Sequence, residues 1–147
     1  MKYISHRGNL NGPNPVRENA PDYIGEAIDA GFEVEMDLRM VGGHLYLGHD
    51  YPQYRVATSW IDHWQDKLLL HIKDTASLNY VMMNRSKWHY FCHEHDRFTF
   101  TSQECVWLHD LSLQASLTTI VPLISRELLA SYKNREVYAI CSDYVMG

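Results

Sequence analysis

The clearest pattern of polar and apolar positions in the chain is a strict alternation over residues 32–40. A period of two predicts a β-strand, because successive side chains of a strand point to opposite faces. One face of this strand would carry Glu33, Glu35, Asp37 and Arg39, and the other Val34, Met36, Leu38 and Met40. The Gly42-Gly43 pair that follows predicts a two-residue hairpin turn into a second strand over residues 45–49.

Other stretches predict strands and helices that alternate along the chain. Further strands are expected over residues 2–6, 68–73, 88–92, 98–101, 105–108, 117–123 and 136–141. Helices are expected from an Asn19 cap to Gly31, over residues 59–67 and 75–85, and from a Ser125 cap to Tyr132. Such alternation is typical of an α/β fold with a largely parallel sheet, here as one domain over residues 1–147.

The composition and charge of the chain argue against nucleic acid as a partner and against a membrane span. The chain is 46% hydrophobic and 21% charged, which is ordinary for a folded protein. A formal net charge of −5, without any run of Lys or Arg, argues against a nucleic-acid-binding surface. No stretch approaches the roughly 18 apolar residues that a membrane span needs, and the N-terminal residues lack the apolar segment of a signal peptide. We therefore expect a cytoplasmic protein with no membrane span.

The charged row of the strand over residues 32–40 has two explanations. It could form the solvent side of a half-exposed sheet. Both faces of a parallel sheet are covered, however, and buried ions without partners are costly. The alternative is that the row converges with His6 and Arg7, which end the first strand, and with His71 and Lys73 of a later strand. Together these groups could surround a metal ion and an anion.

Four short motifs follow one another in a recognisable order. They are His6-Arg7-Gly8, Glu18-Asn19-Ala20 ahead of a helix, Glu35-Met36-Asp37 and His49-Asp50. In this order they resemble the glycerophosphodiester phosphodiesterases, members of a superfamily that includes the phosphatidylinositol-specific phospholipases C. Residues 68–73 and 139–144 resemble a later strand and the closing strand of that family.

The resemblance implies a metal-dependent phosphodiesterase that hydrolyses a small or lipid-derived phosphodiester, such as a glycerophosphodiester of lipid metabolism. It implies that His6 and His49 act as general acid and base, and that Arg7 and Lys73 contact the phosphate, with Glu18 steadying the His6-Arg7 end. Histidine suits this chemistry because it titrates near neutral pH. Since proton transfer supplies only about 10²- to 10⁴-fold, cationic groups must stabilise the developing charge as well.

The implied metal site departs from the family at its third position. Glu35 and Asp37 would bind a divalent cation, Mg²⁺ or Ca²⁺ by resemblance, but the third carboxylate of the family falls on His71. His71 is either a ligand or a bystander. As a ligand it would soften the site and favour Mn²⁺ or Zn²⁺ relative to the harder ions.

The length of the chain departs from the family as well. A complete (β/α)₈ barrel typically takes about 250 residues, whereas this chain has 147. We therefore expect a reduced or distorted (β/α) TIM-type barrel with several outer helices missing. Bare strand faces are normally covered by another subunit, so the sequence also predicts a homo-oligomer.

Two further alternatives stay open at this point. The cluster His93-Glu94-His95-Asp96 is either a polar loop or part of the active-site rim, where His93 and Asp96 would contact substrate. The chain could also be a phosphoryl-transfer lyase that releases a cyclic phosphate, or a catalytically silent phosphate-binding or scaffold domain. The presence of both His6 and His49 favours an enzyme, because binding alone needs only cations.

Overall fold

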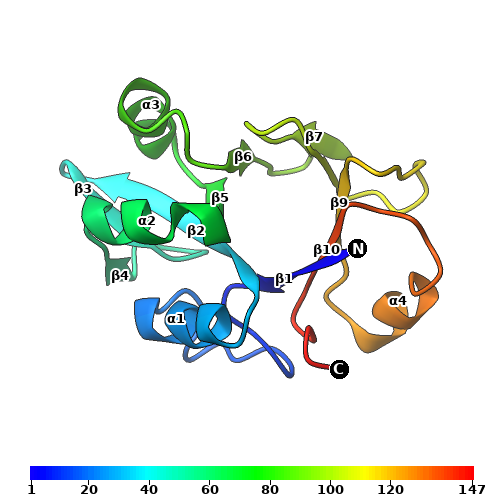
Figure 1. Ribbon diagram of the computed structural model, residues 1–147. Coiled ribbons are helices and arrows are strands. Elements are labelled where there is room, and N and C mark those ends of the chain that lie inside the picture. Colours follow the sequence, from blue (N-terminus) through cyan, green and yellow to red (C-terminus); the bar gives the residue numbers. More distant parts are fainter.

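A computed structural model describes residues 1–147 as a strongly curled, ten-stranded mixed sheet with four short helices (Figure 1). The strands are β1 (Lys2–His6), β2 (Glu33–Val41), β3 (His44–Leu47), β4 (Tyr54–Arg55), β5 (Leu68–Ile72), β6 (Tyr90–Cys92), β7 (Phe98–Phe100), β8 (Val106–Leu108), β9 (Thr119–Pro122) and β10 (Ala139–Ser142). The helices are α1 (Pro21–Asp29), α2 (Thr58–Trp64) with the 3₁₀ turn η1 (Gln65–Lys67), α3 (Thr75–Asn84) and α4 (Arg126–Ser131).

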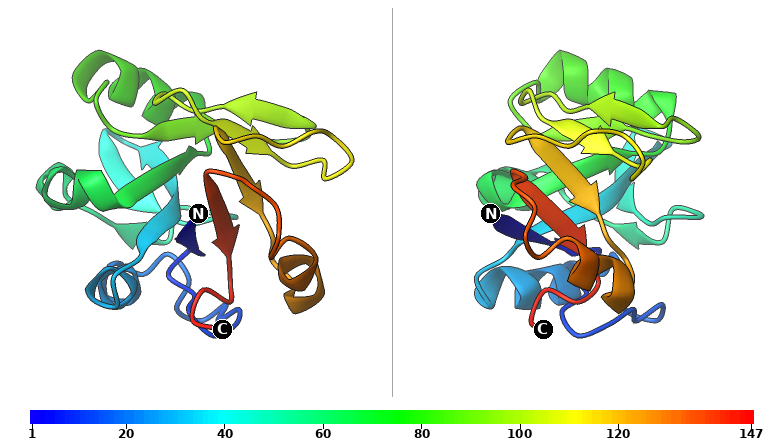
Figure 2. Two further views of the ribbon diagram at one scale, coloured as in Figure 1. Left: turned by 45° about the vertical axis from the view of Figure 1, so that its right-hand side comes forward. Right: turned by 90° about the vertical axis from the view of Figure 1, so that its right-hand side faces the viewer.

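The centre of the sheet is parallel and its margins are antiparallel. The hydrogen-bonded order is β4-β3-β2-β1-β10-β9-β8-β7, with β5 beside β2 and β6 beside β5. The pairs β1–β10, β1–β2 and β2–β5 are parallel, whereas β2–β3, β3–β4 and β7–β8 are antiparallel. Figure 2 shows this sheet curling into a half-barrel. The carboxyl ends of β1, β2, β5 and β10 therefore lie at the same side of the sheet.

The prediction of a reduced TIM-type barrel is wrong. Such a barrel requires a helix after each strand, but no helix lies between β6 and β9, and β7 runs antiparallel to β8. The cause is the length of the connections, because a parallel crossover needs a dozen or more residues and residues 101–105 leave room only for a hairpin. The outermost strands β6 and β7 do not pair, and their ends meet where Ser102 N donates to Tyr90 O at 2.8 Å.

The predicted alternation of β2 sorts its side chains as expected. Val34, Met36 and Leu38 are buried with residues of α1, α2 and α3 in the largest apolar cluster. Glu35 and Asp37 project to the inner side of the curled sheet and are only 1% and 0% exposed, so the charged row is not a solvent face.

A second apolar cluster fills the inner side of the sheet below the polar groups. It contains Ile4, Leu69, Phe91, Trp107 and Ile120, together with Cys105, Ala139 and Cys141. A third cluster lies under α4, where Tyr132 packs with Val121 and Ile140. The inner side is thus apolar at one end and polar at the end where the parallel strands finish.

None of the four helices has the length and hydrophobicity needed to cross a membrane. The structure contains one chain, so the expected homo-oligomer stays a prediction.

Candidate functional site

Three buried side chains from two neighbouring strands form the centre of the polar end. Glu35 and Asp37 come from β2, and His71 of β5 lies directly beside Asp37 in the parallel register. His71 Nδ1 is 3.5 Å from Glu35 Oε1 and 3.3 Å from Asp37 Oδ1. One ligand atom from each residue lies within 4.8 Å of the other two, so this trio could hold a metal ion.

The orientation of His71 suits a metal ligand. Its Nε2 lies 2.9 Å from the carbonyl oxygen of His93, which can only accept, so Nε2 carries a proton. In the neutral ring the lone pair is then on Nδ1, which faces the two carboxylates. The ring is held flat against Phe91, with centroids 4.7 Å apart and an interplanar angle of 19°. Metal-bound histidines commonly donate their second N–H to a carbonyl or carboxylate in this way.

The acidic pair has unused acceptors. Glu35 Oε2 and Asp37 Oδ1 are buried and have no hydrogen-bond partner. Leaving such oxygens unpaired is costly, and a divalent cation would satisfy both. The donor set of two carboxylates and one imidazole therefore fits a divalent metal ion.

Without a metal, the charges of the trio are balanced within the protein. Burial opposes protonation of His71, but the contacts with Asp37 and Glu35 outweigh it and raise the pKa of His71 to about 9. Burial likewise opposes ionisation of Asp37, but His71 and Arg7 outweigh it and lower its pKa. The trio is therefore a coupled group of charges rather than three independent sites.

Arg7 lies immediately next to the trio. Its Nε is 3.1 Å from Asp37 Oδ2, and its Nη1 donates to Glu18 Oε2 at 3.3 Å. The backbone turns sharply here, with φ of 55° at Arg7 and 94° at Gly8. A Cβ at Gly8 would lie 2.7 Å from a ring carbon of Tyr23, so this turn requires glycine. The His-Arg-Gly motif thus serves to turn the guanidinium towards the acidic pair.

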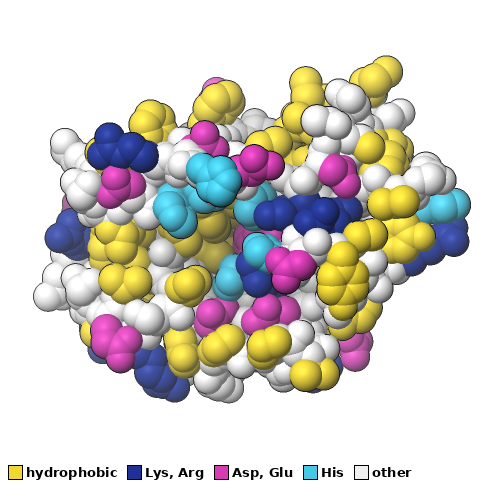
Figure 3. All heavy atoms as spheres, turned by 180° about the vertical axis from the view of Figure 1, so that it is seen from behind, with side chains coloured by type: hydrophobic (Ala, Val, Ile, Leu, Met, Phe, Trp, Pro, Cys, Tyr) yellow, Lys and Arg dark blue, Asp and Glu magenta, His cyan; other side chains and the backbone are white.

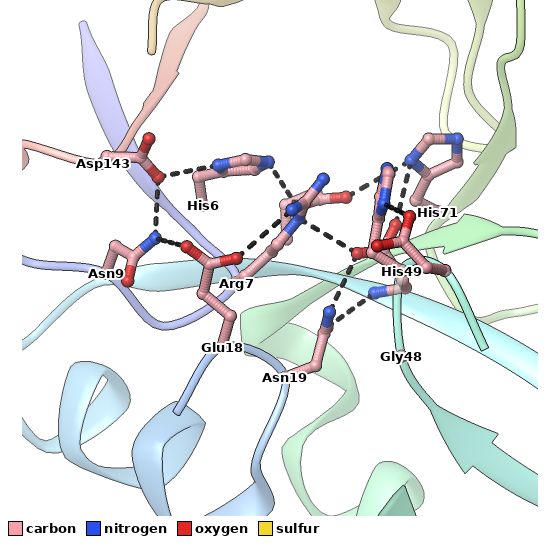
Figure 4. Close-up of polar contacts among 12 residues, drawn as sticks. His6, Arg7, Asn9, Glu18, Asn19, Gly48, His49, His71 and Asp143 are labelled. Atoms are coloured by element: carbon pink, nitrogen blue, oxygen red, sulfur yellow. Dashed lines mark hydrogen bonds and ion pairs between the residues drawn. The ribbon is translucent and has the colours of Figure 1, made fainter. Parts of the chain in front are cut away.

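His6 is oriented by a carboxylate that the sequence analysis did not assign. Its Nδ1 is 2.7 Å from Asp143 Oδ1, and its Nε2 is 3.8 Å from Glu35 Oε2 (Figure 4). Because a carboxylate only accepts, Nδ1 carries the proton and Nε2 faces the site. Burial opposes protonation of His6, but the hydrogen bond that its Nδ1 donates to Asp143 and the charge of Glu35 outweigh burial and raise its pKa.

Two asparagines complete the support of the site. Asn9 Nδ2 donates to Asp143 Oδ1 at 2.8 Å and to Glu18 Oε1 at 2.9 Å. Asn19 exchanges two hydrogen bonds with Asp37, one through its Nδ2 and one through its Oδ1, both of 2.9 Å. The prediction that Asn19 caps α1 is wrong, because Ala20 is the N-cap and Asn19 turns back to Asp37 with a φ of 67°.

His49 and Lys73 lie at the edge of this polar group. The side chain of His49 is 40% exposed, and its Nδ1 lies 2.7 Å from Asp50 Oδ1. Figure 4 shows its ring on the other side of Arg7 from His6. Arg39 fixes the loop by donating to the carbonyl oxygens of Gly48 and His49. Lys73 is half-buried, and its ammonium has no hydrogen bond or ion pair within the chain.

One cleft of about 710 Å³ connects most of the predicted site residues. Figure 3 shows histidine and basic side chains gathered around this hollow. His6, Arg7, Glu35, His49, His71, Lys73 and His93 all line it. Asp96 does not: it is exposed and borders a neighbouring hollow of about 500 Å³.

The supporting residues Asp143, Asn9 and Asn19 were missed as functional groups. Asn9 follows the His6-Arg7-Gly8 motif, Asn19 lies inside Glu18-Asn19-Ala20, and Asp143 follows the last strand of the chain. Only the parallel pairing of β1 with β10 places Asp143 beside His6, and no local pattern carries that pairing.

The comparisons with known proteins give no family. No protein-family model matches the chain, and neither the curated proteins nor the solved structures yield a match. The chemistry of the cleft and the resemblance of the motifs are therefore the features that point to a function.

Proposed function

We propose that this protein is a divalent-metal-dependent phosphodiesterase that hydrolyses a phosphodiester in the 710 Å³ cleft. The observation that carries the proposal is the convergence of three functions in one place. The three groups are the Glu35-Asp37-His71 trio, which suits a metal ion, the guanidinium of Arg7, and the imidazole of His6, which a carboxylate orients. Contacts of 2.7 to 3.8 Å join them. Each of these three kinds of group can accelerate the hydrolysis of a phosphodiester.

The proposed roles follow from the position of each group. Arg7 and Lys73 bind the phosphate oxygens, since both are cations at the cleft. A metal ion held by Glu35, Asp37 and His71 would add positive charge that stabilises the phosphoryl group. His6 and His49 share the proton transfers: one accepts a proton from the attacking water and the other donates one to the departing alkoxide. The products are a phosphomonoester and an alcohol.

The identity of the metal is the finer part of the proposal. Two carboxylates favour hard ions such as Mg²⁺ and Ca²⁺, whereas the imidazole of His71 adds a borderline ligand. We therefore expect Mn²⁺ or Zn²⁺ to bind more tightly than Mg²⁺ or Ca²⁺. Titration calorimetry with each ion on EDTA-treated protein measures this order directly.

A metal-by-substrate screen tests the function. The EDTA-treated protein would be loaded with Mg²⁺, Ca²⁺, Mn²⁺ or Zn²⁺ and assayed with bis(4-nitrophenyl) phosphate. His6→Ala should lower kcat by about 10²- to 10⁴-fold, the usual contribution of a general acid or base. His63→Ala is the matched control, because His63 is exposed on α2 and away from the cleft.

Three outcomes of the screen would contradict the proposal. Activity that survives both His6→Ala and His49→Ala would remove the histidines from the mechanism. No cleavage with any ion, together with unchanged phosphate affinity in His6→Ala, would indicate a phosphate-binding domain. A cyclic product without label in ¹⁸O-water, from a substrate with a neighbouring hydroxyl, would assign a phosphoryl-transfer lyase instead.

A further inference from the structure

The lining of the 710 Å³ cleft is of two chemically different kinds. Polar groups come from β1, β2 and β5, from the loops that follow β1, β3, β5 and β6, and from His109 after β8. The remaining lining, from β8, β9, the segments that follow these two strands and α4, is apolar. We call this part the apolar wall, and it consists of Trp107, Leu111, Pro122, Ile124 and Leu128.

Two side chains of the apolar wall are exposed to solvent without packing against the core. Ile124 is 54% exposed and Leu128 is 37% exposed. On the same helix, Leu129 and Tyr132 pack into the cluster under α4, so this segment already has a buried apolar side. Isolated exposed apolar residues are common, but here both border the same cleft as the cationic groups.

The occupant of such a cleft must match both surfaces. Arg7 and Lys73 call for an anionic group, and the apolar wall calls for a hydrocarbon group attached to it. A phosphodiester of two polar alcohols would leave Ile124 and Leu128 in water. The cleft volume of about 710 Å³ is within the range of about 300–1,000 Å³ that small-molecule sites occupy, so it has room for more than a phosphate.

We infer that the substrate is an amphiphilic phosphodiester, whose apolar ester group packs against Ile124 and Leu128 while its phosphate lies at Arg7. This inference rests on the proposed function, because it names the substrate class of the same cleft. Hydrolysis adds water to phosphorus and breaks one P–O bond, which leaves the apolar group on the phosphomonoester or on the released alcohol.

The experiment compares two substrates that share one leaving group. Methyl 4-nitrophenyl phosphate and octyl 4-nitrophenyl phosphate both release 4-nitrophenol, and both would be assayed below the micelle concentration of the octyl ester. Partial burial of the octyl chain should raise kcat/KM of the octyl ester about 10-fold or more above that of the methyl ester. The double variant Ile124→Ser/Leu128→Ser should lower this ratio about 10-fold.

A control and a second measurement make the test decisive. Met83→Ser should leave the octyl-to-methyl ratio unchanged, since Met83 is 83% exposed on α3 and does not line the cleft. Calorimetric titration with octyl methyl phosphate and dimethyl phosphate measures the same preference as binding. Tighter binding of the octyl ester that disappears in the double variant supports the preference of the cleft for amphiphilic phosphodiesters even if neither aryl ester is cleaved, and the absence of cleavage then contradicts only the proposed hydrolysis.

Two results would overturn the inference. The first is equal cleavage and equal binding of the short and long esters by the native chain, with the phosphodiesterase activity intact. The second is a native chain that sediments as a dimer and a double variant that sediments as a monomer with an unchanged ester ratio. That result would assign the apolar wall to a second copy of the chain.

Discussion

At the scale of single residues, the site depends on side chains that orient other side chains. Asp143 is the clearest example of such a side chain. It contacts no residue of the trio Glu35, Asp37 and His71, and it still sets the tautomer of His6. Its own pKa is lowered: burial opposes ionisation, but the hydrogen bond with His6 outweighs burial. Asp143 is therefore a positioning residue whose removal should be visible on His6 itself.

Asp143→Asn should lower kcat by about 10²- to 10⁴-fold, because an amide replaces the carboxylate that fixes the proton of His6 on Nδ1. The pKa of His6, followed by NMR, should also fall, since the hydrogen bond that His6 donates to the Asp143 carboxylate raises it. Asp29→Asn is a suitable control because Asp29 is exposed at the end of α1. A pKa of His6 in Asp143→Asn equal to that in the native chain would contradict this role, even if activity were reduced.

His71→Glu replaces the imidazole of the trio by the carboxylate that the family resemblance implies. Three buried carboxylates would then face one another, so the metal-free variant should unfold at a lower temperature than the native chain. Mg²⁺ should raise the Tm of the variant more than that of the native chain, and Zn²⁺ affinity should decrease relative to Mg²⁺ affinity. Thermal unfolding with and without each ion measures both effects. An identical ion response in the two proteins would indicate that His71 is a bystander.

At the scale of elements, the loop after β3 is held by a close backbone approach. A Cβ at Gly48 would lie 2.0 Å from the carbonyl oxygen of Tyr51, which leaves no room for any other residue. The amide of Gly48 also donates to Asp37 O at 3.1 Å, so the loop that presents His49 is tied to β2. The position of His49 therefore depends on this glycine.

Gly48→Ala should destabilise the protein by about 1–3 kcal/mol, the usual cost of local strain, and should displace His49 from the cleft. Gly25→Ala offers an internal comparison. Gly25 lies inside α1 with nothing within 4 Å of an added Cβ, so alanine there should stabilise the protein by about 0.5–1 kcal/mol. Urea unfolding of both variants tests the pair. Equal stability changes of the same sign would show that the close approach at Gly48 is not limiting.

Local patterns predicted most individual elements of this fold. The alternation in β2, the glycine turn into β3 and the Ser125 cap of α4 depend on neighbouring residues, and each is observed in the structure. The Asn19 cap failed because the side chain has a better partner in Asp37, which is distant in sequence. Asp143 escaped assignment for the same reason. The side chains that orient the site residues reach them through contacts between segments that are distant in sequence. Such contacts leave no short pattern in a single sequence.

At the scale of the whole molecule, most of the residues that the resemblance named line one cleft, but on a scaffold that the resemblance did not predict. The first half of the chain contains the parallel strands that α1, α2 and α3 cover, and the trio Glu35, Asp37 and His71 lies on these strands. From β6 to β9 no helix separates the strands, and these strands form the far side of the curled sheet. The apolar wall of the cleft comes from the second half of the chain, because β8, β9 and α4 border the site through Trp107, Pro122 and Leu128.

The contact between the two ends of the curled sheet should make the stability of the whole fold depend on pH through His89. This residue precedes β6, and its Nε2 lies 2.7 Å from Thr101 Oγ1, which follows β7. Burial lowers the pKa of His89 below its usual value, with Glu33 opposing this effect and Lys2 adding to it. The unfolded chain therefore binds this proton more readily than the folded chain. The stabilisation is complete above a pH of about 6.5, the ordinary pKa of histidine, and is lost as the pH falls below it.

In His89→Gln the Tm should fall less between pH 8 and pH 5 than in the native chain, whereas His63→Ala should keep the native profile. Parallel profiles for His89→Gln and the native chain would exclude His89 as the titrating group.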